Sequence, residues 1–474
     1  MGLGAISDAV LSRLESGAAD ARAAFEPVVR LGVTGLARSG KTVFITSLVA
    51  NLLDRGRMLG FTPEAEGRIV AAYLQPQPDA TVPRFDYEGN LAALTATVPH
   101  WPDSTRAISQ LRLSLRLRPG GMLASMRGAR MVHIDIIDYP GEWLLDLALL
   151  DQSYAQWSQA ALARAAKPGR AGMAKAWLAK LEGVDALAVL DEPTAQSLAA
   201  AFTAYLQNTR DAGLSPGAPG RFLLPGDLAG SPALTFAPMP PPASRARNTS
   251  LYRAFERRYE AYRSEIVKPF FRQHFARLDR QVVLLDVLDA LHTGPVAMQE
   301  MRDDLASVLA AFRPGADSWL GRLLRRRIDR ILFAATKADH LHHTSHDDLA
   351  ALTTALLREA RDRAAFAGAE TRGMALAALR ATVEQTLSHE GAALNCVRGL
   401  LAGNPPREAA LYPGAFPDDP DAVLNDARAA QPQWLGGGFE LMSFLPQPGA
   451  RQKGMGLAHI RMDQAAEFLL ADRL

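Results

Sequence analysis

Short apolar runs alternate with longer segments in which apolar residues recur every three or four positions, from residue 28 to about residue 385. The short runs are typical of buried β-strands and the longer segments of amphipathic helices. Alternation of this kind favours an α/β fold with a mainly parallel sheet and helices on both faces. Two of the runs are separated by Pro119-Gly120-Gly121 and are expected to pair as an antiparallel hairpin. The expected strands are residues 28–34, 111–118, 131–138, 281–288, 331–336 and 374–379.

The spacing of these elements also predicts how the chain is divided. We expect an N-terminal helix in residues 1–27 and an α/β domain in residues 28–385. Two large, mostly helical insertions, residues 53–103 and 144–275, are expected to interrupt that domain, and the second contains a Pro-rich stretch. Residues 386–474 are expected to form a C-terminal extension with short strands and a closing helix.

Composition excludes several classes of protein. The 474 residues carry 52 Lys and Arg against 50 Asp and Glu, a net charge of +2, which is too balanced to indicate a nucleic-acid partner. The single cysteine, Cys396, excludes an intramolecular disulfide and a multi-cysteine metal site. No apolar stretch is long enough to span a bilayer. We therefore expect a soluble, cytoplasmic protein.

The first expected strand is followed by residues with the spacing G-x-x-x-x-G-K-T. In such a P-loop, backbone N–H groups surround phosphate oxygens and the next helix directs its positive end at them. Lys41 is expected to neutralise the outer phosphates and Thr42 to bind Mg²⁺. Only seven of the 52 basic residues are lysines, which makes an incidental lysine here a poor explanation. The expected phosphate-binding residues are Gly35, Leu36, Ala37, Arg38, Ser39, Gly40, Lys41, Thr42 and Val43.

A second motif, Asp138-Tyr139-Pro140-Gly141-Glu142, directly follows the expected strand 131–138. An aspartate at the carboxyl end of a strand can hold the coordination shell of Mg²⁺. A glycine three residues later can direct its N–H at a γ-phosphate and respond when that phosphate is lost. Asp138 is therefore a predicted metal residue, and Gly141 a predicted nucleotide-binding residue.

A third motif, Thr336-Lys337-Ala338-Asp339, follows another expected strand and fits the pattern [NT]-K-x-D. The aspartate can accept two hydrogen bonds from the edge of guanine, which adenine cannot donate. The aliphatic part of Lys337 is expected to cover the base. The sequence thus predicts GTP and GDP as ligands, with Thr336, Lys337 and Asp339 in the site.

Together with WPDSTRAISQLRL and the DYPGEW segment, these motifs resemble the YcjX-like family of bacterial P-loop GTPases over nearly the whole chain. The resemblance implies a Ras-like G domain with helical insertions, GTP hydrolysis, nucleotide-dependent switch segments and a link to envelope stress. It also places the backbone of Ala378, Leu379 and Arg380 near the base. Thr336 and Arg380 stand where many GTPases have asparagine and lysine.

The same resemblance places the second Mg²⁺-binding threonine just before the strand that pairs with the D-x-x-G strand. The candidate is Thr105, with Ser104 as the alternative. Either Arg106 or Arg38 is a candidate for an arginine that stabilises charge during hydrolysis. Glu142 takes the place of the glutamine that orients water. With Lys41, Glu142 and Arg106 as the catalytic set, we expect slow hydrolysis and a role as a nucleotide-state switch with a protein effector or regulator.

Four alternatives remain open. The P-loop also suits an ATPase, and a scaffold that binds nucleotide without hydrolysing it would carry the same binding motifs. Four histidines between His340 and His346 form either a metal site or, as the spacing favours, a polar loop that leads into a helix capped by Thr344 or Ser345. The basic segment 318–330 either packs on the sheet or contacts an anionic membrane peripherally.

Overall fold

The computed structural model describes residues 26–35, 39–105, 107–119, 128–311, 328–358, 369–403, 405–429, 434–437 and 439–474. The expected N-terminal helix therefore lies almost wholly outside the described residues. The same holds for most of the basic segment 318–330. Four candidate site residues are also outside them: Leu36, Ala37, Arg38 and Arg106.

A seven-stranded sheet with the order β2-β3-β4-β1-β5-β6-β7 forms the centre of the protein. Strands β4, β1, β5, β6 and β7 are parallel, while β3 is antiparallel to both of its neighbours. The mainly parallel α/β fold and the β3–β4 hairpin are thus confirmed. The strands are β1 (Val28–Gly35), β2 (Ile69–Gln75), β3 (Ser109–Leu117), β4 (Arg130–Asp138), β5 (Arg280–Leu285), β6 (Arg330–Ala335) and β7 (Glu370–Ala375).

Three strands differ from the sequence expectation. Strand β5 ends at Leu285 rather than at residue 288, because Asp286 caps the helix α12 (Val287–Thr293) that follows it. Strand β2 lies inside residues 53–103, where no strand was expected, because it is a half-exposed edge strand without a continuous buried run. This segment is therefore not mostly helical. Strand β7 covers 370–375 rather than 374–379, because its polar first half, Glu370 to Gly373, hides the strand pattern. Ala378, Leu379 and Arg380 consequently lie in the loop after β7.

Alternate residues of the sheet face two separate cores. Val282 and Leu284 of β5 pack in the core that contains the first helix, whereas Val283 and Leu285 face the opposite core. The helices of the first core are α2 (Lys41–Leu53), α4 (Tyr87–Thr95) and the closing helix α18 (Met462–Leu470). The second core contains α12 (Val287–Thr293), α13 (Pro295–Ala311), α15 (His346–Leu356) and α17 (Pro420–Ala429).

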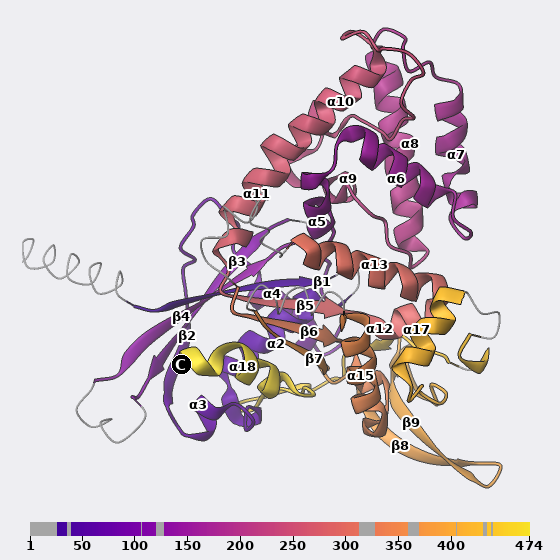
Figure 1. Cartoon of the computed structure of the whole chain (residues 1–474). Coiled ribbons are helices and arrows are strands. Elements are labelled where there is room, and N and C mark those ends of the chain that lie inside the picture. The colour runs from indigo at the N-terminus through magenta and orange to yellow at the C-terminus, as the bar shows by residue number, and fades with distance from the viewer. Residues whose placement is uncertain are drawn as a thin grey trace, which may run out of the picture.

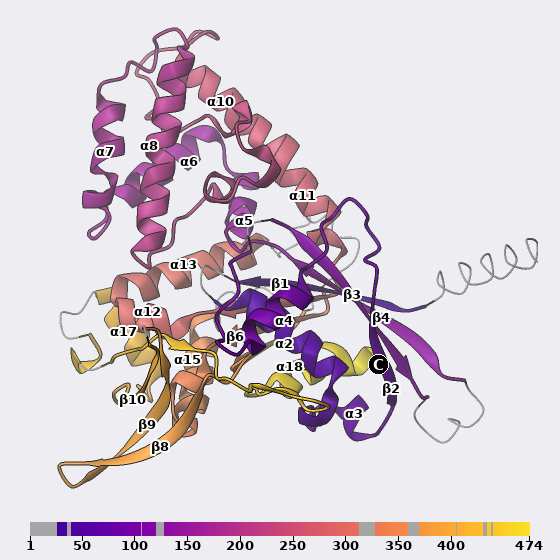
Figure 2. The same cartoon turned by 180° about the vertical axis from the view of Figure 1, so that it is seen from behind.

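Between β4 and β5 the chain forms a helical region that stands to one side of the sheet (Figures 1 and 2). A buried ion pair, Arg170 Nε to Glu300 Oε1 at 2.5 Å, fastens this region to α13. The chain returns to the sheet through one helical rod, residues 251–273, whose middle is a π-helical turn, Tyr262–Val267. The helices of the region are α5 (Glu142–Leu145), α6 (Tyr154–Ala165), α7 (Ala171–Glu182), α8 (Glu192–Asp211), α9 (Gly220–Leu223), α10 (Leu251–Ala261) and α11 (Lys268–Gln273).

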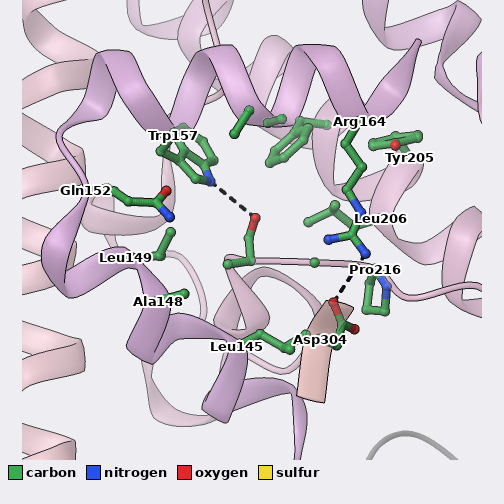
Figure 3. A pocket seen from close by; sticks show the side chains of 15 residues that line it. Leu145, Ala148, Leu149, Gln152, Trp157, Arg164, Tyr205, Leu206, Pro216 and Asp304 are labelled. Atoms are coloured by element: carbon green, nitrogen blue, oxygen red, sulfur yellow. Dashed lines mark hydrogen bonds and ion pairs between the residues drawn. The ribbon is translucent and has the colours of Figure 1, made fainter. Parts of the chain in front are cut away.

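A pocket of about 230 Å³ lies where this region meets α13. Leu145 and Leu149, from the segment that follows β4, line one side, and Trp157 lines another (Figure 3). Arg164 and Asp304 form an ion pair of 3.3 Å at its border. The pocket leaves unfilled space beside the segment that connects the sheet to the helical region.

After β7 the chain forms a small second sheet and short helical segments. Its strands are β8 (Thr382–His389), β9 (Ala392–Leu401), β10 (Arg407–Leu411) and β11 (Phe444–Leu445). The β8–β9 hairpin projects from the body of the protein (Figure 1). Within the described ranges, no helix has both the length and the apolar character needed to cross a membrane.

Candidate functional site

The carboxyl ends of the parallel strands meet at one edge of the sheet. Val33 of β1 is opposite Asp138 of β4, and Ala335 of β6 is opposite Ala375 of β7. Because β3 runs the other way, its first residue, Ser109, is also opposite Asp138. The P-loop, the D-x-x-G segment and the residues before β3 are therefore neighbours. This is the edge at which open α/β sheets bind ligands.

The P-loop connects β1 to α2. Gly40 has φ 77°, a left-handed conformation that strains residues with a Cβ, which explains the glycine at this position. Its carbonyl oxygen accepts from the backbone N–H of Phe44 at 2.8 Å and closes the first turn of α2. The N-terminus of α2 comes soon after the carboxyl end of β1, and the helix dipole favours an anion there.

Lys41 extends from the first turn of α2 to the D-x-x-G segment. Its Nζ lies 2.7 Å from Asp138 Oδ1 and donates to the backbone oxygen of Tyr139 at 2.9 Å. The Lys41 side chain is 9% exposed and the Asp138 side chain 2%. The Tyr139 hydroxyl donates to Gln281 Oε1 at 2.9 Å in the buried region behind this pair. The ammonium group is thus held by the segment predicted to respond to the γ-phosphate.

Three oxygen-bearing side chains converge beside this ion pair. Thr105 Oγ1 donates to Asp138 Oδ2 at 2.8 Å and lies 3.3 Å from Thr42 Oγ1. Ser109 Oγ donates to the same Asp138 oxygen at 3.4 Å. Ser104, the alternative to Thr105, is exposed. Hydroxyl and carboxylate oxygens are the ligands that Mg²⁺ prefers, so the three residues predicted for the metal have the chemistry and the proximity that it needs.

Directly after Asp138 the chain enters the helical region. Gly141 is the N-cap of α5, and Glu142 is buried in its first turn. Helix α9 packs against this turn so closely that a Cβ on Gly220 would lie 2.0 Å from the backbone oxygen of Glu142. The Arg221 guanidinium lies 3.3 Å from the centre of the Trp143 ring, a cation–π contact. Burial lowers the pKa of Arg221.

Asp146, which follows α5, joins this segment to the helical rod. Its carboxylate accepts from Tyr262 Oη at 2.5 Å and from the backbone N–H of Gly220 at 2.7 Å. Burial raises the pKa of Asp146 to about 6, although both hydrogen bonds and the nearby charge of Arg221 favour the ionised form. Asp146 was not predicted from the sequence, because its partners lie 74 and 116 positions away.

Replacement of Asp146 by asparagine is expected to flatten the dependence of stability on pH. The folded chain holds the proton on Asp146 up to about pH 6, whereas its ordinary pKa is 3.8, so the wild-type free energy of unfolding falls as pH rises through this interval. An asparagine can still accept from Gly220 and donate to Tyr262. Urea unfolding between pH 4.5 and 7 measures the effect. An unchanged slope in the variant would contradict it.

The Thr336–Asp339 segment lies at the same edge, after β6. Thr336 Oγ1 donates to the backbone oxygen of Leu285 at 3.2 Å. Lys337 has φ 60° and its ammonium group forms an ion pair with Asp286, directly after β5. Asp286 was not among the residues predicted from the sequence. Its position at the carboxyl end of a buried strand is the signal that was available.

Asp339 is 4% exposed, and the chain that follows β7 holds it through hydrogen bonds. Its Oδ2 accepts from the backbone N–H of Ala381 at 2.8 Å, and the Thr382 hydroxyl donates to its backbone oxygen. The neighbouring loop is fixed by its own contacts, since Ser47 of α2 donates to the oxygen of Ala378. Ala381 and Thr382 thus hold Asp339 directly. The predicted contact of residues 378–380 with the base stays a prediction.

Comparison with known proteins identifies the family of the chain. A family model described as "YcjX-like family, DUF463" matches residues 29–474. The chain belongs to the YcjX-like family. It is 37% identical over 463 residues to "Ras-like GTPase YcjX" of Escherichia coli strain K12, a match that covers 94% of this chain and 96% of that protein. It is 34% identical over 469 residues to the protein of the same name in Shewanella oneidensis, with 94% of each covered.

The match to the YcjX-like family extends from β1 to the closing helix and so includes the P-loop, the helical region and the small second sheet. Both relatives are matched over nearly their full lengths. The similarity therefore applies to the whole architecture and is not confined to the P-loop.

Proposed function

We propose that this member of the YcjX-like family binds GTP with Mg²⁺, hydrolyses it slowly and acts as a switch between nucleotide states. One observation carries the proposal: Lys41, Thr42, Thr105 and Asp138 converge at the sheet edge that also presents Asp339. The names of the two relatives, both Ras-like GTPases, support it. So does the sheet, in which the P-loop strand is central and a single hairpin strand runs antiparallel.

The proposed phosphate site uses the N-terminus of α2 and Lys41. Against a triphosphate, the Lys41 ammonium would exchange part of its contact with Asp138 for phosphate oxygens, a charge-assisted interaction of the same kind. Thr42 and Thr105 would hold the metal through their hydroxyls, and Asp138 would hold its shell. When bound, Mg²⁺ neutralises charge on the outer phosphates. The chain itself orients the phosphates and keeps the Lys41 charge beside them.

The proposed base site depends on Asp339. A carboxylate offers about four lone-pair positions, so its bond to Ala381 leaves capacity for the two donors on the edge of guanine. Adenine presents a different pattern there and would leave the buried carboxylate unsatisfied, which is unfavourable. The Lys337–Asp286 ion pair would hold the lysine beside the base. GTP and GDP are therefore the proposed ligands.

Slow hydrolysis follows from what the chain offers for catalysis. Glu142 is the described candidate for positioning water, and a carboxylate beside the γ-phosphate adds repulsion. The two arginine candidates, Arg38 and Arg106, lie outside the described residues. We propose turnover well below the 1 to 100 per second typical of kinases.

The proposed output of the switch is the helical region. Gly141 leads directly into α5, which contacts α9 through Gly220 and the rod through Asp146. A movement of the backbone at Gly141 would therefore displace α5 against α9 and the rod, because close packing transmits such displacements. The pocket beside Leu145 and Leu149 leaves room for these side chains to move. An unidentified effector or regulator would bind the region that moves.

Multiple-turnover phosphate release from GTP and from ATP tests the proposal, with Lys41→Ala as the background control. We expect slow, Mg²⁺-dependent release from GTP and release from ATP no faster than that of the control. Faster release from ATP would identify an ATPase. Tight GTP binding with no release above the control would identify a scaffold that binds nucleotide without hydrolysing it.

Removal of the Thr105 hydroxyl should weaken GTP binding that depends on Mg²⁺ and leave the Mg²⁺-independent part of the binding intact. Thr105→Ala is expected to weaken GTP binding in the presence of Mg²⁺ by about tenfold, because the metal ion loses one of the oxygen atoms that hold it. Binding measured in EDTA should change little. Ser104→Ala is the matched control, since it removes the neighbouring, exposed hydroxyl. Equal effects of both variants would remove Thr105 from the proposed metal site.

A further inference from the structure

Two adjacent histidines and a glutamate 41 positions further along the chain meet beside the Asp339 loop. His343 Nδ1 is 2.6 Å from Glu384 Oε2, and His342 Nε2 is 3.7 Å from the same oxygen. One nitrogen from each imidazole and one oxygen of the carboxylate lie within 4.8 Å of one another. The histidines follow β6, whereas Glu384 belongs to β8. The fold therefore brings to the histidines a carboxylate that is distant from them in the sequence.

The three groups have the composition and spacing of a zinc site. Zinc binds imidazole nitrogens and carboxylate oxygens at about 2.0–2.2 Å, so tetrahedral ligand atoms lie roughly 3.3 Å apart. The distances of 2.6 and 3.7 Å bracket this value. His342 Nδ1 lies 3.0 Å from Thr344 Oγ1, a contact that can orient the ring with Nε2 toward Glu384. The histidine side chains are 13% and 65% exposed, so an ion can reach them.

We propose that His342, His343 and Glu384 bind one Zn²⁺ ion, with water at the fourth position. The ion replaces the direct hydrogen bond between His343 and Glu384. It links the two segments that also enclose Asp339, because Ala381 and Thr382 lie just before Glu384 on the chain.

This link predicts an effect on nucleotide exchange, and that effect rests on the proposed function, whereas zinc binding does not. A metal that ties the 339–343 segment to β8 restricts the opening of the loop around Asp339. We therefore expect zinc to slow the release of GDP from the wild type.

Competition with a chromogenic zinc chelator tests the site in the tag-free, full-length chain. The wild type should bind one equivalent of Zn²⁺. His343→Ala and Glu384→Gln should each weaken this binding roughly tenfold or more, since each removes one of three ligands. His389→Ala is the matched control, because it removes an exposed imidazole from the end of the same strand. Zinc affinity equal to that of the wild type in His343→Ala and Glu384→Gln would overturn the site.

Arg380 supplies a second, opposite test. Its Nη2 lies 3.7 Å from Glu384 Oε1, the oxygen that does not face the imidazoles, and its positive charge opposes a bound cation. Arg380→Ala should therefore bind zinc more tightly, by a few-fold. Weaker binding would contradict the proposed ligand set. The rate at which the wild type releases a fluorescent GDP, measured with and without zinc, tests the link to Asp339. Release that is as fast with zinc bound as without it would overturn that link.

Discussion

Replacement of Lys41 by methionine is expected to weaken the binding of GTP by about 100-fold or more. Charge-assisted hydrogen bonds contribute about 1.5–3 kcal/mol each, and an ammonium beside the outer phosphates makes more than one. Lys41 is placed for this role by the first turn of α2, and its ammonium already lies 2.7 Å from Asp138. Titration of a fluorescent GTP analogue measures the loss.

The design must separate lost binding from lost folding. Without Lys41, the nearly buried Asp138 carboxylate loses its ion-pair partner, and a buried, unpaired charge is destabilising. Thermal melting of each variant monitors this, and Lys41→Arg provides a version that keeps the charge. Lys453→Met is the control for loss of a lysine, because Lys453 is exposed. GTP affinity within a few-fold of the wild type in a folded Lys41→Met protein would exclude the proposed phosphate site.

Replacement of Asp339 by asparagine is expected to change which base is preferred. The variant should bind GTP about 100-fold more weakly and should gain affinity for xanthosine triphosphate, which carries an oxygen where guanine has its amine. The loss corresponds to about 3 kcal/mol for a bidentate, charge-assisted pair. The asparagine carbonyl can still accept from the N–H of Ala381, so the loop should keep its fold. Competition binding with GTP, ATP and xanthosine triphosphate provides the measurement.

Asp347→Asn is the matched control for this experiment. Asp347 lies in the first turn of α15, near Asp339 in the sequence, and its side chain is 90% exposed. It should bind all three nucleotides as the wild type does. If ATP protects the wild type from thermal melting as well as GTP does, guanine recognition by Asp339 is refuted.

The parts of the site that the sequence could predict are those encoded in adjacent residues. The P-loop, the segment from Asp138 to Gly141 and the segment from Thr336 to Asp339 each follow an apolar strand. A strand and the turn that follows it are contiguous in the sequence, so both can be recognised from a short stretch of residues. The alternation of short apolar runs with helical segments along the chain likewise predicted the mainly parallel sheet. Thr105 was predicted because the family resemblance places a threonine just before the strand that pairs with the D-x-x-G strand.

The residues that were missed make contacts across long stretches of sequence. Ala381 reaches Asp339 from 42 positions away, and Glu384 reaches His343 from 41. The two ends of each contact come together only when β6 and the chain after β7 pack side by side. Strand β2 escaped notice because an edge strand has one unpaired side and needs no continuous apolar run. These features depend on tertiary packing.

The helical rod of residues 251–273 is held near its middle, where Tyr262 donates to Asp146. At 1.5 Å per residue, 23 residues span about 34 Å, and Tyr262 stands near the middle. A tilt of about 5° around that point moves the two ends by roughly 1.5 Å in opposite directions, the scale of helix shifts in known switches. If the rod tilted about Tyr262, its N-terminal end at Leu251 and the end that leads to β5 would therefore move in opposite directions. A partner bound at the N-terminal end of α10 would be displaced accordingly.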